Sequence, residues 1–252
     1  MRISGLQKVT LLDYPGHIAC TIFFGGCNLR CPFCHNMELV EHPEHFPEIK
    51  REEVIDFLKE RKGKLNGVAI TGGEPLLNTD IGELLHEIKA LGYPIKLDTN
   101  GFFPDMIEKL IDEKLVDMFA MDIKAGFSNY SIVAGITTQP CESCTTERRG
   151  EHCEPGAISE KLQDSINKSI SLLINKALDY EFRTTCVKGL HSEKDFYEIR
   201  DMIKGAKAYF LQDYKAAPGM ESLPYKPFTR EELESFSSIV KDAVVSVNIR
   251  GV

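Results

Sequence analysis

The sequence has no excess of positive charge and no long hydrophobic run. Its 252 residues include 30 lysines and arginines against 38 aspartates and glutamates, which gives a net charge of −8. This balance argues against a protein that binds nucleic acid through a general basic surface. No stretch approaches the roughly 18 apolar residues that a membrane-spanning helix needs. We therefore expect neither nucleic acid nor a membrane as a partner.

Residues 1–16 also lack the apolar core of a signal peptide. A long chain with eight cysteines and no secretory signal is typical of a reduced, cytoplasmic protein rather than a disulfide-linked one. The sequence contains no internal repeat and no low-complexity linker. Its length suits one domain of α/β-barrel size or two small ones. The seven histidines are scattered and show no paired metal-ligand spacing.

Three cysteines lie within one eight-residue loop, and a fourth is missing from it. They are Cys27, Cys31 and Cys34. Three thiolates so close together can hold three corners of an iron–sulfur cube, whereas a fully protein-ligated cluster or a structural zinc uses four ligands. The iron without a protein ligand would be open to a substrate or a cofactor. The alternative is a zinc site that borrows a fourth ligand, such as His35 or Cys20.

Strand-like and helix-like segments alternate along the chain, which predicts an α/β fold with a parallel sheet and outer helices. About six such units would form a partial barrel rather than the closed eight-stranded form. The predicted strands are residues 18–24, 68–71, 94–99, 116–123, 181–187, 209–214 and 244–249. The predicted helices are residues 51–62, 81–91, 105–114, 162–180 and 193–204, with one more after residue 228.

Polar and glycine-containing motifs follow four of these strands in turn. The first strand leads into the cysteine loop. The second leads into Gly72-Gly73-Glu74, where the glycines let backbone approach a ligand and the carboxylate can bind an amino group. The third leads into residues 97–101 and the fourth into residues 121–124. Each motif alone could be an ordinary turn. Barrel-type sheets gather their active-site residues at the carboxyl ends of the strands, so four motifs in series predict one site.

The spacing Cys27-x3-Cys31-x2-Cys34 with Phe33, together with Gly72-Gly73-Glu74, resembles the signature of the radical S-adenosylmethionine (SAM) enzymes. Within that superfamily the chain is similar to glycyl-radical-enzyme activases, specifically to activating proteins of anaerobic ribonucleoside-triphosphate reductase. The segments that carry this closer similarity are residues 5–8, 12–16, 34–36, 97–101, 121–124 and 181–185. The resemblance implies a single radical SAM domain over residues 1–252, a partial (βα)6 TIM-like barrel, with a cysteine-bearing insertion at about 137–157.

The resemblance also implies an oxidoreductase with two cofactors, a [4Fe–4S] cluster on Cys27, Cys31 and Cys34 and SAM itself. One-electron reduction would cleave SAM to methionine and a 5′-deoxyadenosyl radical, which abstracts a hydrogen atom. In an activase the hydrogen comes from a glycine of a large partner enzyme, here anaerobic ribonucleotide reductase, and a flavodoxin- or ferredoxin-type protein donates the electron. The alternative is a radical SAM enzyme that acts on a small molecule, such as a 7-carboxy-7-deazaguanine synthase or a mutase.

The resemblance assigns roles to individual side chains, while the chemistry itself belongs to the cofactors. The Gly73 backbone and Glu74 would face the methionyl amine, and Asp98 with Thr99 would lie near the ribose. Related activases hold a monovalent cation beside the cofactor carboxylate, and Asp98, Thr99 and Asp122 of this chain match the positions that bind it. Lys124 and Arg183 would place positive charge near the carboxylate or the adenosyl group, although Lys124 could instead form a surface ion pair. The predicted cofactor-binding residues are Phe33, Gly72, Gly73, Glu74, Asp98, Thr99, Asn100, Asp122, Lys124 and Arg183.

The insertion departs from the family, because many activases carry extra cysteines before the Gly-Gly-Glu strand rather than after it. Here Cys141, Cys144 and Cys153 could hold zinc or an auxiliary cluster, with His152, Cys186 or an exogenous group as fourth ligand. The alternative is a polar loop whose thiols bind no metal. We expect Cys20 and Cys186 to be small core residues. For His35 and Asn36 we expect hydrogen bonds to backbone rather than a role as ligands.

Overall fold

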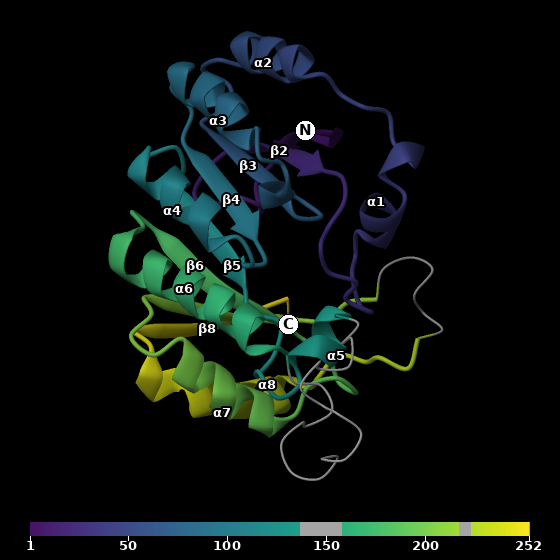
Figure 1. Ribbon diagram of the computed structural model, residues 1–252, viewed down its shortest axis with the longest axis vertical. Coiled ribbons are helices and arrows are strands. Elements are labelled where there is room, and N and C mark those ends of the chain that lie inside the picture. Colours follow the sequence, from purple (N-terminus) through teal and green to yellow (C-terminus); the bar gives the residue numbers. More distant parts are fainter. Residues whose placement is uncertain (137–157, 217–222, 252) are drawn as a thin grey trace. The chain divides into compact units, whose positions relative to one another are not determined.

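The computed structural model describes residues 1–136, 158–216 and 223–251 of the chain (Figure 1). Strands and helices alternate over most of this length. The elements, in chain order, are β1 (Ile3–Thr10), β2 (Ala19–Phe24), α1 (Met37–Glu41), the 3₁₀ helix η1 (Pro43–His45), α2 (Arg51–Glu60), β3 (Gly67–Gly72), η2 (Pro75–Leu77), α3 (Ile81–Ala90), β4 (Ile95–Thr99), α4 (Pro104–Asp112), β5 (Met118–Asp122), α5 (Tyr130–Ala134), α6 (Glu160–Lys176), β6 (Tyr180–Cys186), α7 (Glu193–Met202), β7 (Ala208–Asp213), α8 (Arg230–Val240), η3 (Lys241–Ala243) and β8 (Ser246–Arg250). None of the described helices is long and apolar enough to cross a membrane.

The chain divides into two compact units. The first unit comprises Met1–Asn28, Asn36–Asp122 and Ser171–Glu181, and the second comprises Leu29–His35, Ile123–Ile170 and Phe182–Val252. We describe each unit by itself. The single domain over residues 1–252 stays a prediction.

In the first unit the sheet follows the order of the chain from β1 to β5. Strand β1 is antiparallel to β2, and β2, β3, β4 and β5 are parallel. Strand β2 pairs with β3 over its whole length, from Ala19 opposite Gly67 to Phe24 opposite Gly72. This register brings the start of the cysteine loop beside the Gly72-Gly73-Glu74 motif.

The helices of the first unit bury one apolar stripe each. In α3 the stripe consists of Ile81, Leu84, Leu85 and Ile88, all of them fully buried. These positions recur at intervals of three and four residues, which places them on one face of a helix. Strand β2 is buried at five of its six positions, as expected for a parallel strand that is covered on both faces.

In the second unit β6, β7 and β8 are parallel, with Phe182 opposite Tyr209 and Tyr209 opposite Val247. Helices α7 and α8 pack against each other through Phe196 and Phe236, whose rings stack with their centroids 4.2 Å apart. The buried aromatic side chains give this smaller sheet its own core.

The prediction of an α/β fold with mostly parallel strands is confirmed. All seven predicted strands are present, and their ends differ from the prediction by a few residues. The prediction missed the antiparallel strand β1 and the two short helices α1 and α5.

Candidate functional site

The Gly72-Gly73-Glu74 motif of the first unit lies against the segment that leads into Cys27. A Cβ atom on Gly73 would lie 1.8 Å from the carbonyl oxygen of Gly26 and 3.3 Å from Cys27 Cβ. The Gly73 N–H donates to Phe24 O at 2.9 Å, and the Glu74 N–H donates to Gly26 O at 2.9 Å. Only glycine can approach another backbone so closely. The end of β3 and the beginning of the cysteine loop therefore form one tightly fitted structure.

Glu74 is buried and ties the end of β3 to the end of β4. Its carboxylate accepts hydrogen bonds from Thr99 Oγ1 at 2.9 Å and from the Asn100 N–H at 2.7 Å. It also accepts from the Leu76 N–H at 3.1 Å, and the residue is 1% exposed. A buried carboxylate needs such donors to offset its lost hydration. Glu74 thus holds the two predicted cofactor-binding residues Thr99 and Asn100 in place.

Asn100 connects β4 to the cysteine loop. Its Nδ2 atom donates to Asn28 Oδ1 at 2.7 Å and lies 3.8 Å from Cys27 Sγ, within hydrogen-bonding distance for sulfur. Hydrogen bonds to thiolate sulfur are one means by which a protein tunes an iron–sulfur cluster. Our sequence analysis missed Asn28, because an asparagine beside a cysteine carries no signal of a partner on a distant strand.

Asp98 forms an ion pair with Lys96, which the sequence analysis also missed. The Lys96 side chain is only 3% exposed and that of Asp98 17%. Residues two apart on a strand project to the same face, so the lysine can reach the carboxylate. The signal was available in principle, since a lysine between Ile95 and Leu97 interrupts an apolar strand. Asp122, also predicted to contact the cofactor, ends β5 of this unit.

The rest of the cysteine loop belongs to the second unit, where α5 supports it. The Arg30 N–H donates to Ala134 O at 3.0 Å, and the Cys34 N–H donates to Cys31 O at 3.0 Å. Gly135 ends α5 with a φ of +61°, and a Cβ there would lie 1.8 Å from Arg30 O. Cys31 is buried and Cys34 half-buried. Helix α5 and its glycine therefore fix the backbone of the loop.

His35 and Asn36 form the backbone hydrogen bonds that we expected. In the second unit His35 Nε2 lies 2.5 Å from Lys215 O. In the first unit Asn36 Nδ2 donates to Gly72 O at 3.0 Å. These contacts hold the two ends of the short segment that follows Cys34.

His191, which the sequence analysis did not single out, links two predicted cofactor-binding residues of the second unit. Its Nε2 atom donates to Lys124 O at 2.8 Å, and its Nδ1 atom accepts from the Val187 N–H at 3.1 Å. Its ring meets the Phe33 ring edge-on, with the centroids 6.4 Å apart. Burial lowers the pKa of His191, opposed by the hydrogen bond to Lys124 and the charge of Asp195. The ring is therefore neutral, with its proton on Nε2.

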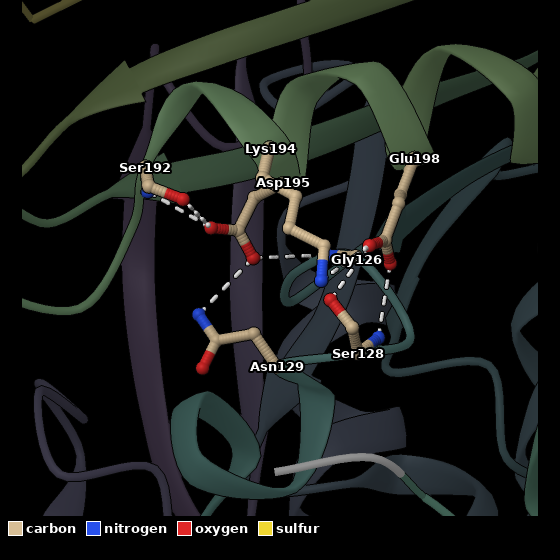
Figure 2. Close-up of polar contacts among 7 residues, drawn as sticks. All are labelled: Gly126, Ser128, Asn129, Ser192, Lys194, Asp195 and Glu198. Carbon is tan, nitrogen blue, oxygen red and sulfur yellow. Dashed lines mark hydrogen bonds and ion pairs between the residues drawn. The ribbon is translucent and has the colours of Figure 1, made fainter. Parts of the chain in front are cut away.

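Helix α7 holds the segment that follows Lys124 (Figure 2). Asp195 is 2% exposed and accepts from the Gly126 N–H at 3.3 Å and from Asn129 Nδ2 at 3.1 Å. It also accepts from the N–H and the hydroxyl of Ser192, at 2.8 and 3.0 Å. One buried carboxylate thus caps its own helix and anchors the chain after β5.

Glu198, one turn further along α7, anchors the same segment at a second point. Its carboxylate accepts from the Ser128 N–H at 2.9 Å and from the Ser128 hydroxyl at 2.6 Å (Figure 2). Lys124 leads into this pinned segment, and Arg183 lies on β6, where its carbonyl accepts from the Ile123 N–H at 2.9 Å. The backbone on both sides of these two basic residues is fixed.

Cys141, Cys144 and Cys153 lie outside the described residues, as does His152. Cys186, a candidate fourth ligand for them, is fully buried in β6, and burial raises its pKa. Cys20 is fully buried in β2, and burial raises its pKa to about 12. Both residues are core thiols, as predicted.

Comparison with known proteins supplies a family for this arrangement. Residues 21–148 match the radical SAM superfamily. MJ1227 of Methanocaldococcus jannaschii, provisionally assigned as a glycyl-radical enzyme activating enzyme, is 31% identical over 98% of this chain and 95% of its own length. The pyruvate formate-lyase-activating enzyme of Clostridium pasteurianum is 32% identical over 49% of this chain and 52% of its own. The crystal structure of Streptococcus suis SuiB bound to precursor peptide SuiA is similar in fold, with a TM-score of 0.63 at 17% identity over 92% of this chain and 48% of SuiB.

Proposed function

Since the chain belongs to the radical SAM superfamily and, within it, to the glycyl-radical enzyme activating enzymes, we propose that it installs a glycyl radical on anaerobic ribonucleoside-triphosphate reductase. The observation that carries the activase assignment is the relationship to MJ1227 over 98% of this chain, which a shared cofactor-binding core alone would not require. The choice of the reductase as partner rests on the family resemblance of the sequence.

We propose Cys27, Cys31 and Cys34 as the three protein ligands of a [4Fe–4S] cluster. The donor set fits, because three thiolates leave one iron for SAM. The surroundings of Cys27 fit as well, since Asn100 directs an N–H toward its sulfur and Gly73 permits close backbone contact. When bound, such a cluster delivers the electron that splits SAM into methionine and the radical that abstracts hydrogen from glycine.

The residues at the strand ends would bind and orient SAM. We propose that the Gly73 backbone and Glu74 face the methionyl amine, and that Glu74, through its bonds to Thr99 and Asn100, also fixes the shape of this part of the site. Asp98 and Thr99 would lie near the ribose. Together with Asp122, they could also hold a monovalent cation. The Lys96 ammonium pairs with Asp98 and can stand in for the positive charge of such a cation.

Two basic residues and one aromatic residue of the second unit complete the proposed set. Lys124 and Arg183 would offer positive charge to the SAM carboxylate or the adenosyl group, and Phe33 would line the site next to Cys34. His191 supports this assignment, because it contacts the Phe33 ring and binds the Lys124 carbonyl. We further propose that Cys141, Cys144 and Cys153 bind zinc or an auxiliary cluster, and that a flavodoxin or ferredoxin donates the electron.

The test begins with anaerobically reconstituted, dithionite-reduced protein. We expect a [4Fe–4S]⁺ electron paramagnetic resonance signal that shifts when SAM is added, together with 5′-deoxyadenosine formation. Cys34→Ser should lose both, whereas Cys186→Ser, at a core thiol, should keep both. A signal that SAM does not change, or a protein that holds only zinc, would refute the proposal.

The partner is tested by adding anaerobic ribonucleotide reductase and recording the glycyl-radical signal. We expect the radical to form on the reductase and to disappear when the glycine that carries it is replaced by alanine. Radical formation on pyruvate formate-lyase instead would keep the activase assignment and change the partner. Cleavage of SAM with no radical on either enzyme would favour the alternative of a small-molecule substrate.

A further inference from the structure

Three potential metal ligands converge on the surface of the first unit directly after α1. They are His42, Glu44 and His45, and their ligand atoms all lie within 4.8 Å of one another. The two imidazole rings stack with centroids 4.9 Å apart at 14°, and His42 Nδ1 lies 3.3 Å from Glu44 Oε1. The expectation of scattered histidines is therefore wrong for this pair, because a 3₁₀ turn brings them together.

We propose that His42, Glu44 and His45 bind one divalent transition-metal ion, separate from the cysteine sites. Imidazole ligands favour ions such as Zn²⁺, whereas Mg²⁺ and Ca²⁺ prefer sites made only of oxygen. Zinc bonds of about 2.0–2.1 Å require ligand atoms roughly 3.4 Å apart. The side chains are 54%, 63% and 57% exposed, so rotation about their own bonds can close the remaining gap.

The charge of the surrounding segment favours a cation. Between Met37 and Ile49 the sequence contains four glutamates and no lysine or arginine, and Arg2 pairs with Glu48 at 3.2 Å, which leaves three glutamates to favour a cation. One of them, Glu38, has its Oε1 atom 3.6 Å from His45 Nδ1. Carboxylates in this position orient the histidine ligands of metal sites and raise their basicity. Glu38 can thus orient the His45 ring from outside the metal's own ligands. Water would fill the remaining coordination positions of the metal.

Hydrogen bonds fix the backbone that carries the three side chains before any metal binds. Arg2 Nε donates to Pro43 O at 3.1 Å, and Arg2 Nη2 donates to Phe46 O at 3.0 Å. The turn is closed by the bond from the His45 N–H to His42 O at 2.9 Å. Proline at position 43 fixes one backbone angle of the turn. Binding therefore has to order side chains only, which lowers its entropic cost.

The site adjoins the segment that precedes Cys27. A Cβ on Gly25 would lie 2.6 Å from Pro43 Cβ, and the Gly26 N–H donates to Leu39 O at 3.0 Å. A metal that links residues 42–45 would stiffen the turn against which Gly25 packs. This structural role does not depend on the proposed function.

Zinc on the reconstituted protein is counted by equilibrium dialysis against Zn²⁺, with iron measured in the same samples. The variants are His42→Ala, His45→Ala and His86→Ala. His86 is the matched control, because it is 61% exposed and lies 3.3 Å from the carboxylate of Glu113, and the described residues place no third ligand beside these two. Any zinc bound by thiols is common to all four proteins and cancels in the comparison.

We expect His42→Ala and His45→Ala to bind one zinc ion fewer per chain than the parent, and His86→Ala to bind the same number. Iron content and 5′-deoxyadenosine formation should be equal in all four proteins. The zinc site and the activase proposal can therefore fail independently of each other. Equal zinc binding by all four proteins at every free Zn²⁺ concentration would overturn the proposed site. Equal loss in the His86→Ala control would overturn it as well.

Discussion

Lys96 carries its charge into the interior of the first unit, where it pairs with Asp98. Removing the lysine takes away one charge-assisted hydrogen bond to this carboxylate, a contribution of about 1.5–3 kcal/mol. We predict that Lys96→Met lowers the free energy of unfolding by an amount of this order. It should also make 5′-deoxyadenosine formation depend more strongly on K⁺, because a bound cation can then replace the missing charge beside Asp98. Denaturant unfolding and a K⁺ titration of activity measure the two effects.

The matched control for this prediction is Lys89→Met. Lys89 pairs with Asp117 at 2.8 Å in the same unit, but the two side chains are 30% and 26% exposed and neither is a predicted cofactor residue. We expect this variant to lose less stability and to keep the K⁺ dependence of the parent. An unchanged K⁺ response in Lys96→Met would show that the lysine does not stand in for a cation.

His191 predicts a pH dependence of stability. Its pKa in the folded protein is lowered by burial below the ordinary 6.5. The unfolded chain therefore binds more protons between the two pKa values, so this contribution to stability is fully present above pH 6.5 and is lost as the pH falls toward the folded pKa. We predict that His191→Gln flattens the decline in the free energy of unfolding below pH 6.5 by up to about 1.4 kcal/mol per pH unit. Denaturant unfolding of the parent and of His191→Gln at several pH values measures it.

At the scale of elements, the junction between β3 and the cysteine loop depends on a single glycine. A methyl group on Gly73 would overlap the Gly26 carbonyl, which is backbone and cannot move aside. We predict that Gly73→Ala loses iron and at least about tenfold in 5′-deoxyadenosine formation, equivalent to 1.36 kcal/mol of transition-state stabilisation. In the control Gly82→Ala, an added Cβ would meet nothing within 4 Å apart from its chain neighbours and the backbone of its own helix. That substitution, at the second residue of α3, should leave both the stability and the iron content of the protein close to those of the parent.

The elements themselves were predictable where hydrophobic periodicity is strong. Strand β2 and helix α3 bury continuous apolar patterns, and both were predicted to within a residue or two. Strand β1 was missed because Gly5 and three exposed positions weaken its hydrophobic pattern. Its extended backbone is stabilised by pairing with β2. Helices α1 and α5 have five residues each, too few for a periodic signal.

The candidate site could be predicted in part for a similar physical reason. The glycines, cysteines and strand-end carboxylates stand in short motifs whose residues are close in sequence. The partners that hold them, such as Asn28, Lys96 and His191, become visible only when distant strands and helices fold together. A single histidine between Leu190 and Ser192 carries no sign that it will meet Phe33.

For the whole molecule, donor chemistry separates three candidate metal-binding groups. The Cys27, Cys31 and Cys34 group and the Cys141, Cys144 and Cys153 group offer thiolates, which favour iron–sulfur clusters or zinc. The third group, built around His42 and His45, offers imidazole and carboxylate. Iron, sulfide and zinc per chain, measured in the parent and in variants of each group, therefore show which group binds which metal.

The insertion is tested within that inventory by the triple variant in which Cys141, Cys144 and Cys153 become serine. We predict that it loses either zinc or one cluster's iron and sulfide, while keeping the SAM-responsive signal and 5′-deoxyadenosine formation that depend on the other three cysteines. The same substitutions leave the histidine group untouched, so its zinc should remain. A triple variant with the metal content of the parent would show that the insertion binds no metal. Loss of all iron would instead mean that the two cysteine groups cannot be treated as separate, and the assignment of Cys27, Cys31 and Cys34 as sufficient ligands would fail.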